Sequence, residues 1–376
     1  MKIAFISTRG IPNNYGGIEQ LTEYISVGLV ERGHDVVVYS PHYHPYREDV
    51  YRGVRLKHIY SPEKWMGSAI GSFFYDFSSL RHALKKEKYD IIYDVGYTSI
   101  VPAYIWFNVK KIKDPIFVTN MDGLEYKRSK FNKWVRKFIF WEEGVTVKHS
   151  HHLITDNMGI HDYYLEKYGK KSKFLTYGAN IYDNYSVDVL KEFELEENNY
   201  FLLVARLEPE NNIELAIKGY LCSEKQDKPF VIVGKKNTPH GKYLYETYAK
   251  KRNIKFVGGI YDFDQLNSIR YYSYAYFHGH SVGGTNPSLL EAMASSCFIL
   301  AHDNIFNRAV LKENAIYCSS GEQFSVILND LETLVFKHKE TYVKNNLKEI
   351  CDQYSWKRAI DEHEKYFYVL LNRIGR

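Results

Sequence analysis

Short apolar runs recur along the first half of the chain, and segments with helical periodicity separate them. The runs are KIAFIST, DVVVYSP, VRLKHIY, YDIIYDVG, PIFVTNMD, HLITDN and KFLTYG. Strands that alternate with helices in this way indicate parallel strands joined by crossover connections. The pattern therefore predicts an α/β domain with a doubly wound sheet.

The second half repeats this order of elements after an interruption. The polar stretch NIYDNYSVDVLKEFELEENN lacks strand-like alternation, and we interpret it as the connection between two domains. The runs YFLLVARL, PFVIVGKK, IKFVGGI, YAYFHGH, CFILAHD and AIYCS then alternate with helical segments. We expect Rossmann-like domains over residues 1–180 and 181–355 that face a cleft, and a final helix over 356–376 that packs on the first domain.

Length and composition agree with two globular domains. A chain of 376 residues exceeds the size at which one core usually stops growing, and its net charge of +5 is too small to indicate a nucleic-acid binder. The four cysteines show no CxxC spacing, which fits reduced thiols. The N-terminus lacks the features of a secretory signal, and no apolar run approaches the roughly 20 residues of a membrane span. We expect a cytoplasmic protein whose membrane contact is peripheral.

A pair of glycines follows the first expected strand. In STRGIPNNYGGIEQLTEYISVGLVERG, Gly16 and Gly17 lead into a helix predicted from about Ile18 to Glu31. Adjacent glycines allow a tight turn, and the N-terminus of a helix favours an anion such as phosphate. The simpler interpretation is a turn without a ligand. The segment is neither GxGxxG nor GxxxxGK(S/T), which disfavours a nicotinamide dehydrogenase and excludes a P-loop NTPase.

Arg206 ends the first expected strand of the second domain, in LLVARLEPENNIELAIKGY. An arginine at the carboxyl end of a strand can direct its donors at a ligand, and a guanidinium suits bidentate contact with a diphosphate. The alternative is a surface arginine that pairs with Glu208 or Glu210.

The segment FHGHSVGGTNPSLLEAMASS predicts a second helix N-terminus that could bind an anion. Gly283 and Gly284 free the backbone, Thr285 or Asn286 can cap the helix, and a proline suits the first helical turn. Glu291 falls about one turn later, where a carboxylate can accept hydrogen bonds from two adjacent sugar hydroxyls. Its apolar neighbours favour a half-buried carboxylate with a polar partner.

Together these motifs resemble the retaining family 4 glycosyltransferases, which have the GT-B fold. The resemblance rests on the glycine pair, on VARLEPENN and on SLLEAM. The combination NYGGIE, DGLEYKR and HGHSVGGTNPSLLEAM is similar to a bacterial subgroup that includes rhamnosyltransferases of capsule and O-antigen assembly. The family implies an acceptor-binding first domain, a nucleotide-sugar-binding second domain, retention of configuration, and neither cofactor nor metal.

The resemblance also implies roles for individual residues. Arg206 would hold the donor phosphates, and Glu291 would bind the nucleotide ribose. Two positions depart from the family pattern, since Asn211 replaces a common lysine and Gly283 replaces the first of two glutamates, which commonly faces the donor sugar. The other donor-binding residues that we expect are Gly16, Gly17, Asn211, His280, Gly284, Thr285 and Asn286.

Asp122 and Glu125 are candidates for the acceptor side of the reaction. In NMDGLEYKRSKF, Asp122 follows an expected buried strand and stands where many relatives carry a histidine. We expect Asp122, with Arg206 and Glu125, to carry the catalytic roles, Asp122 and Glu125 by orienting the acceptor hydroxyl or the donor sugar. The alternative for Asp122 is capping of the turn at Gly123.

The segment KRSKFNKWVRKFIFW, from Lys127 to Trp141, interleaves cations with aromatics. This pattern is typical of an amphipathic helix at an anionic membrane surface, and the alternative is a helix that packs its aromatics inward. A membrane contact would suit an undecaprenyl-diphosphate-linked saccharide acceptor, which the subgroup implies. The expected contact residues are Lys127, Arg128, Lys130, Lys133, Trp134, Arg136 and Lys137.

Other interpretations stay open at this point. The histidines His149, His151 and His152 lack a carboxylate or cysteine partner, so we expect no metal site there. The departures at Asn211 and Gly283 leave room for a nucleotide-sugar-binding protein without turnover. A GT-B epimerase that acts on a UDP-sugar is a second alternative.

Overall fold

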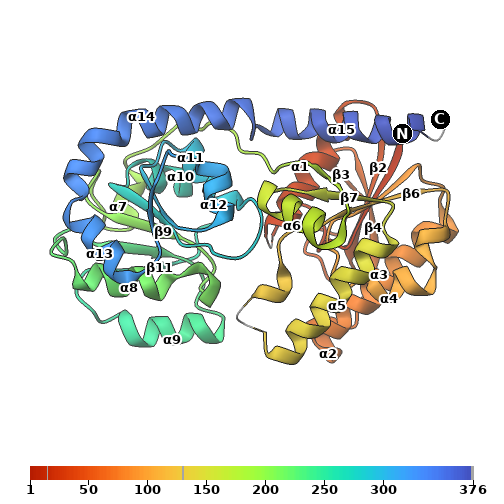
Figure 1. The fold of residues 1–376 in the computed structure, drawn as a ribbon, viewed down its shortest axis with the longest axis horizontal. Coiled ribbons are helices and arrows are strands. Elements are labelled where there is room, and N and C mark those ends of the chain that lie inside the picture. Colours follow the sequence, from red (N-terminus) through yellow and green to blue (C-terminus); the bar gives the residue numbers. More distant parts are fainter. Residues whose placement is uncertain (15, 129–130, 374–376) are drawn as a thin grey trace. The chain divides into compact units, whose positions relative to one another are not determined.

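The computed structural model describes residues 1–14, 16–128 and 131–373 (Figure 1). The chain divides into two compact units. The first unit comprises Met1–Tyr126, Lys133–Gly178 and Trp356–Arg376, and the second comprises Lys127–Asn132 and Ala179–Ser355. The described residues of this short segment thus group with the second unit, although the chain on both sides of it belongs to the first.

Among the described residues, the first unit contains an eight-stranded sheet in the order β3-β4-β2-β1-β5-β6-β7-β8. Ala4 of β1 lies beside Val37 of β2 on one side and beside Ile92 of β5 on the other, both in parallel register. The strand order therefore reverses between β1 and β5. The strands are β1 (Lys2–Ile6), β2 (Asp35–Pro41), β4 (Val54–Ile59), β5 (Ile91–Asp94), β6 (Ile116–Asn120), β7 (His152–Thr155), β8 (Ser172–Phe174) and the antiparallel β3 (Val50–Tyr51).

The second unit contains, in its described part, a six-stranded parallel sheet in the order β11-β10-β9-β12-β13-β14. Leu202 of β9 lies beside Val231 of β10 and Tyr276 of β12, so the order reverses between β9 and β12. Ligands of doubly wound sheets bind at such reversals, beyond the carboxyl ends of the strands. The strands are β9 (Phe201–Val204), β10 (Phe230–Val233), β11 (Ile254–Gly258), β12 (Ala275–His278), β13 (Ile299–His302) and β14 (Ile316–Cys318).

Helices cover both sheets and complete two Rossmann-like units, which confirms the predicted fold class. Strands β1, β6 and β10 are almost wholly buried and mostly apolar, as expected of strands covered on both faces. The helices of the first unit are α1 (Gly17–Glu31), α2 (Glu63–Met66), α3 (Ser68–Lys86), α4 (Val101–Trp106), α5 (Lys133–His149), α6 (Met158–Tyr168) and α15 (Trp356–Arg373). Those of the second are α7 (Val189–Glu192), α8 (Ile213–Cys222), α9 (Pro239–Tyr248), α10 (Phe263–Tyr271), α11 (Pro287–Ala294), α12 (Ile305–Leu311), α13 (Gly321–Asn329) and α14 (Leu331–Asp352). Short 3-10 helices are η1 (Val109–Lys111), η2 (Glu125–Lys127) and η3 (Pro209–Asn211).

The final helix α15 packs on α1 within the first unit (Figure 1). The ring of Trp356 stacks on that of Tyr24, with centroids 4.1 Å apart. Gly28 leaves the space that the side chain of Ile360 fills, so any larger residue at position 28 would collide with it. Arg32 and His34 both bind Glu364, at 2.8 and 2.7 Å. Helix α15 is therefore an integral part of the first unit.

Replacing Trp356 by alanine should lower the free energy of unfolding of the first unit by about 3–5 kcal/mol, because it removes a large buried ring. Trp356 is 4% exposed, whereas Trp65 is 82% exposed, so Trp65→Ala is the matched control and should change stability by less than about 0.5 kcal/mol. Urea denaturation followed by circular dichroism measures both. An equal effect of the two variants would contradict the packing described for α15.

Candidate functional site

Two loops are joined where the strand order of the second sheet reverses. One contains η3 and follows β9, and the other connects β12 to α11. The side chain of Asn212 donates to the carbonyl of Gly279 at 2.7 Å, and the amide of Ser281 donates to the carbonyl of Glu210 at 2.9 Å. A Cβ at position 279 would overlap the carbonyl oxygen of Asn211, so this close approach requires glycine.

Arg206 lies at the beginning of the η3 loop, two residues after β9. Its side chain is exposed, and within the described residues its guanidinium forms no ion pair or hydrogen bond. The alternative of a pair with Glu208 or Glu210 is thus not realised. A guanidinium without a protein partner at the carboxyl end of a central strand is available for an anionic ligand.

Glu210 instead holds Arg128, which corrects one expectation. The guanidinium of Arg128 lies 3.2 Å from Glu210, and the two side chains are 12% and 1% exposed. We expected Arg128 to face a membrane, but its ion pair buries it against the second unit. Of the neighbouring residues, Lys130 lies outside the described part of the chain.

Asn211, which we expected to contact the donor, forms hydrogen bonds within the protein through its side-chain amide. Its Nδ2 donates to the backbone oxygen of Arg206 at 2.7 Å, and its Oδ1 lies 2.6 Å from Nδ1 of His280. Asn211 is buried, while His280 is half-buried. The asparagine therefore links the backbone that carries Arg206 to the imidazole of the neighbouring loop.

Helix α11 begins immediately after the glycine-rich turn. Asn286 is its N-cap, and its Oδ1 accepts from the backbone amide of Ser288 at 2.9 Å. Gly284 and Thr285, both expected to bind the donor, are buried just before the cap. The predicted helix N-terminus thus exists, and it lies at the edge of the sheet that carries Arg206.

Glu291 is anchored by a buried arginine that the sequence did not reveal. Nη2 of Arg270 lies 2.7 Å from Oε2 of Glu291, and Arg270, whose side chain is 1% exposed, also donates to Asn267 at 3.0 Å. A buried charge requires such a partner. The expected polar partner of Glu291 therefore exists, and it fixes the direction of the carboxylate.

His278 ends β12 and is buried, and its Nε2 has no hydrogen-bond partner among the described residues. Burial, with smaller contributions from Arg270 and His302, lowers the pKa of His278 to about 3. The imidazole is therefore neutral at physiological pH.

The glycine pair of the first unit stands at the reversal between β1 and β5. Gly16 is the N-cap of α1, and Gly17 is its first residue. The buried carboxylate of Glu19 accepts from the backbone amide of Arg9 at 2.9 Å, and burial raises its pKa. A carboxyl group thus occupies the first turn of the helix, and phosphate binding by Gly16 and Gly17 stays a prediction.

Asp122 follows β6, and its Oδ2 accepts from the hydroxyl of Tyr177 at 3.3 Å. The hydroxyl of Tyr97 meets the next residues, since it donates to the carbonyl of Gly123 at 3.5 Å and accepts from the amide of Glu125 at 3.4 Å. These contacts fix the loop that carries Asp122 and Glu125, whose catalytic roles remain predictions.

His151, just before β7, has structural partners. His151 bonds to the amide of Phe117 and the carbonyl of Val109, both at 3.1 Å. Within the described residues no group of three or more histidine, cysteine or acidic side chains could hold a metal ion.

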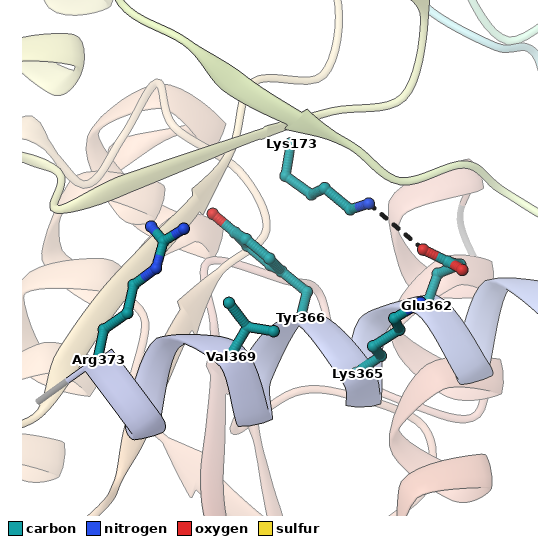
Figure 2. Close-up of a pocket in the computed structure, with 6 residues that line it drawn as sticks. All are labelled: Lys173, Glu362, Lys365, Tyr366, Val369 and Arg373. Atoms are coloured by element: carbon teal, nitrogen blue, oxygen red, sulfur yellow. Dashed lines mark hydrogen bonds and ion pairs between the residues drawn. The ribbon is translucent and has the colours of Figure 1, made fainter. Parts of the chain in front are cut away.

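A small hollow lies between β8 and α15 of the first unit (Figure 2). One ion pair, Lys173–Glu362 at 3.3 Å, spans it. It is lined by Lys173, Glu362, Lys365, Tyr366, Val369 and Arg373, none of which belongs to the predicted site.

Two family models match the sequence, one in each half. Residues 188–349 match the family described as glycosyl transferases group 1. Residues 1–180 match a family described only as a domain of unknown function, DUF1972. A comparison with curated proteins finds no match.

Solved structures share the whole fold at low sequence identity. Sucrose-phosphate synthase from Thermosynechococcus elongatus aligns with a TM-score of 0.80 and 14% identity over 99% of each chain. HepE from Anabaena, solved with UDP-glucose, aligns with a TM-score of 0.74 and 14% identity over 98% of this chain and 100% of HepE. WaaG, a glycosyltransferase of lipopolysaccharide biosynthesis, aligns with a TM-score of 0.72 and 15% identity over 98% of this chain and 99% of WaaG. The fold is GT-B, and the family match supports a glycosyltransferase of group 1.

Replacing His278 by phenylalanine should make stability less sensitive to acid. The depressed pKa in the folded protein means that the unfolded chain binds the proton first as the pH falls. The stability that the neutral, buried ring contributes to the folded state is fully present above about pH 6.5. It is lost as the pH falls toward 3, by up to about 1.4 kcal/mol per pH unit. Denaturant titrations between pH 7 and 4 measure the slope for both proteins. Equal slopes would contradict a buried neutral His278.

Proposed function

We propose that the protein transfers a hexose or deoxyhexose from a nucleotide diphosphate to a lipid-linked saccharide acceptor, with retention of configuration and without a metal ion. The observation that carries the proposal is Arg206, an exposed guanidinium at the reversal of the second sheet that has no partner among the residues the structure describes. The reaction belongs to bacterial surface polysaccharide synthesis in this proposal. Rhamnose is the sugar that the subgroup resemblance favours.

The second unit offers positive charge for the departing diphosphate. Cleavage of the sugar–phosphate bond leaves negative charge on the phosphate oxygens, and preorganised donors lower the barrier to its development. Arg206 supplies a charged donor, and the amides at the start of α11 add the positive end of a helix dipole. Both groups lie at one edge of one sheet, which supports their joint action on one diphosphate.

Glu291 is suited to the ribose of the nucleotide. Arg270 holds one carboxylate oxygen, and the side chain remains 19% exposed, so the group is both fixed and accessible. A carboxylate fixed in this way loses little conformational entropy when it accepts a hydroxyl.

The solved neighbours support a UDP-sugar as an alternative to a dTDP-sugar. HepE was solved with UDP and with UDP-glucose, and WaaG acts in lipopolysaccharide biosynthesis. Asp122 and Glu125 in the first unit remain our candidates for orienting the acceptor hydroxyl.

The first unit presents an aromatic and basic surface that supports contact with an anionic membrane. Helix α5 begins at Lys133 rather than at Lys127, and the residues from Lys133 to Phe138 are all exposed, with Trp134 at 68%. Trp134, Phe138 and Trp141 therefore do not follow the alternative, in which the helix packs its aromatic side chains into the protein.

Helix α4 packs between α3 and α5 in the first unit (Figure 1), and side chains of α3 and α4 extend this surface. The ring of Phe138 contacts that of Phe73 of α3, with centroids 6.3 Å apart, and Phe77 of α3 contacts Trp106 of α4 at 6.1 Å. Exposed aromatic and aliphatic side chains with cations beside them suit an interface of anionic lipid, where each cation contributes about 1 kcal/mol. We call this the aromatic surface; it comprises Trp65, Met66, Ile70, Phe74, Ile105, Trp106, Trp134, Phe138 and Trp141, with Lys64, Lys110, Lys111, Lys133, Arg136 and Lys137.

No helix in the described part of the chain is long and apolar enough to cross a bilayer. The aromatic surface supports peripheral attachment at the inner face of the cell membrane, which we propose. Such attachment would bring the enzyme to an undecaprenyl-diphosphate-linked acceptor.

Incubation with UDP-glucose, dTDP-rhamnose and GDP-mannose, with and without lipid-linked acceptor extracted from bacteria, tests the proposed reaction. Release of nucleotide that requires the acceptor supports transfer. Conversion of a UDP-sugar without acceptor would indicate an epimerase, and binding without release would indicate a protein without turnover.

Arg206→Ala should weaken binding of the nucleoside diphosphate product about tenfold to a hundredfold, because a charged contact to phosphate is lost. Calorimetry measures the dissociation constant. The control is Arg252→Ala, an exposed arginine that precedes β11 at the opposite, amino-terminal edge of the sheet. An equal affinity of both variants would remove Arg206 from the site.

Replacing Trp134 and Trp141 together by serine should lower the fraction of protein that floats with phosphatidylglycerol-containing vesicles at least about fivefold, because two exposed anchors are lost. The matched control is Phe336→Ser, since Phe336 is 92% exposed on α14 of the second unit. Absence of flotation for the unaltered protein would defeat the membrane proposal.

A further inference from the structure

The amino group of Lys167, on α6, lies among four aromatic rings of the first unit. Its Nζ is 3.6 Å from the ring centroid of Phe140, 4.7 Å from that of Tyr163, 4.8 Å from that of Tyr168 and 5.3 Å from that of Tyr126. A cation at such distances is attracted by the negative face of an aromatic ring. We call these four rings the aromatic cage; it joins α5, α6 and η2.

A buried carboxylate binds the cation inside the aromatic cage. The side chain of Glu143, on α5, is 0% exposed, and its Oε1 lies 2.9 Å from Nζ of Lys167. The hydroxyls of Tyr163 and Tyr168 donate to the same oxygen at 2.7 and 2.8 Å. Loss of the lysine would leave the buried carboxylate without its counter-ion, which is strongly destabilising. The ion pair therefore determines whether the rings of the cage stay together.

Tyr126 connects the aromatic cage to the candidate acceptor side. It follows Glu125 directly in η2, its hydroxyl lies 3.2 Å from that of Tyr163, and its ring centroid is 5.0 Å from that of Phe140. Its carbonyl accepts from Nε of Arg136 at 2.8 Å. Side chains of α5 and α6 thus hold the ring, the hydroxyl and the backbone of Tyr126.

The loop 122–126 is held a second time, before Tyr126. The hydroxyl of Tyr97 donates to the carbonyl of Gly123 at 3.5 Å and accepts from the amide of Glu125 at 3.4 Å. Because both ends of the loop are fixed, its side chains lose less conformational entropy when they meet a ligand.

We propose that Lys167 and Glu143 are positioning residues for the reaction, and that they act through Tyr126 on the carboxylates of Asp122 and Glu125. This inference rests on the proposed function, because it assumes that these two carboxylates orient the acceptor hydroxyl. Neither member of the ion pair contacts a substrate. Without the cation the cage opens and the two carboxylates spread over more conformations, so the acceptor is presented less often in a reactive orientation. Donor binding by the second unit is unaffected.

Two variants break the connection at different places. Lys167→Met removes the charge and keeps the length of the side chain, whereas Tyr126→Ala keeps the ion pair and removes its link to the loop. Lys171→Met is the matched control, since Lys171 is exposed and directly precedes β8.

Hydrogen exchange tests the positioning without any substrate. We expect exchange at residues 122–126 to be at least about fivefold faster in Lys167→Met and in Tyr126→Ala than in the unaltered protein and in the control, because the loop is then held at one end only. Exchange in β6 should change less than about twofold. Unchanged exchange in the loop of either variant would overturn the inference while the proposed function stands.

Nucleotide release that requires the lipid-linked acceptor tests the effect on the reaction. With the donor that the unaltered protein uses, Lys167→Met and Tyr126→Ala should release nucleotide about tenfold to a hundredfold more slowly, because the acceptor is misplaced. The dissociation constant of the nucleoside diphosphate, measured by calorimetry, should stay within about twofold.

Unaltered turnover in the two variants, or an equal loss of nucleotide affinity, would overturn the inference alone. If the unaltered protein released no nucleotide with UDP-glucose, dTDP-rhamnose or GDP-mannose, the proposed function would fail, and the role of the ion pair in the reaction would fail with it.

Discussion

The close approach of two backbone segments at the reversal between β9 and β12 determines the geometry of the second unit's site. The η3 loop and the loop before α11 pack so tightly that only glycine fits at position 279, beside the carbonyl of Asn211. Hydrogen bonds from Asn212 and Ser281 hold the two segments together. Arg206, His280 and the start of α11 take their positions from this contact, so the candidate site depends on it.

Buried ion pairs fix the polar groups around this contact. Arg270 orients Glu291 of α11, and Arg128 pairs with Glu210 of the η3 loop. Breaking such a pair leaves an uncompensated buried charge, which costs several kcal/mol. In the described part of the chain the guanidinium of Arg206 has no protein partner, whereas its neighbours are paired, and we therefore assign it to an anionic ligand.

Much of the fold could be predicted from the sequence, because strands buried on both faces appear as short apolar runs between helices. The same holds for the cap of α11 and for the place of Arg206, since both depend on a few consecutive residues. The ion pairs Arg270–Glu291 and Arg128–Glu210 could not be predicted, because their partners lie far apart in the sequence. The start of α5 at Lys133 was missed because residues 127–132 belong to the other unit, which a local helical pattern does not show.

The central claim is that a nucleoside diphosphate binds at the loops after β9 and β12. Hydrogen exchange measured with and without UDP, dTDP or GDP tests it most directly, since it reports the amides that a ligand protects. The account predicts slower exchange at residues 206–212 and 279–288 with at least one of the three nucleotides, and little change at the amino-terminal edge of the same sheet. Protection confined to other segments, or none with any of the three, would contradict it.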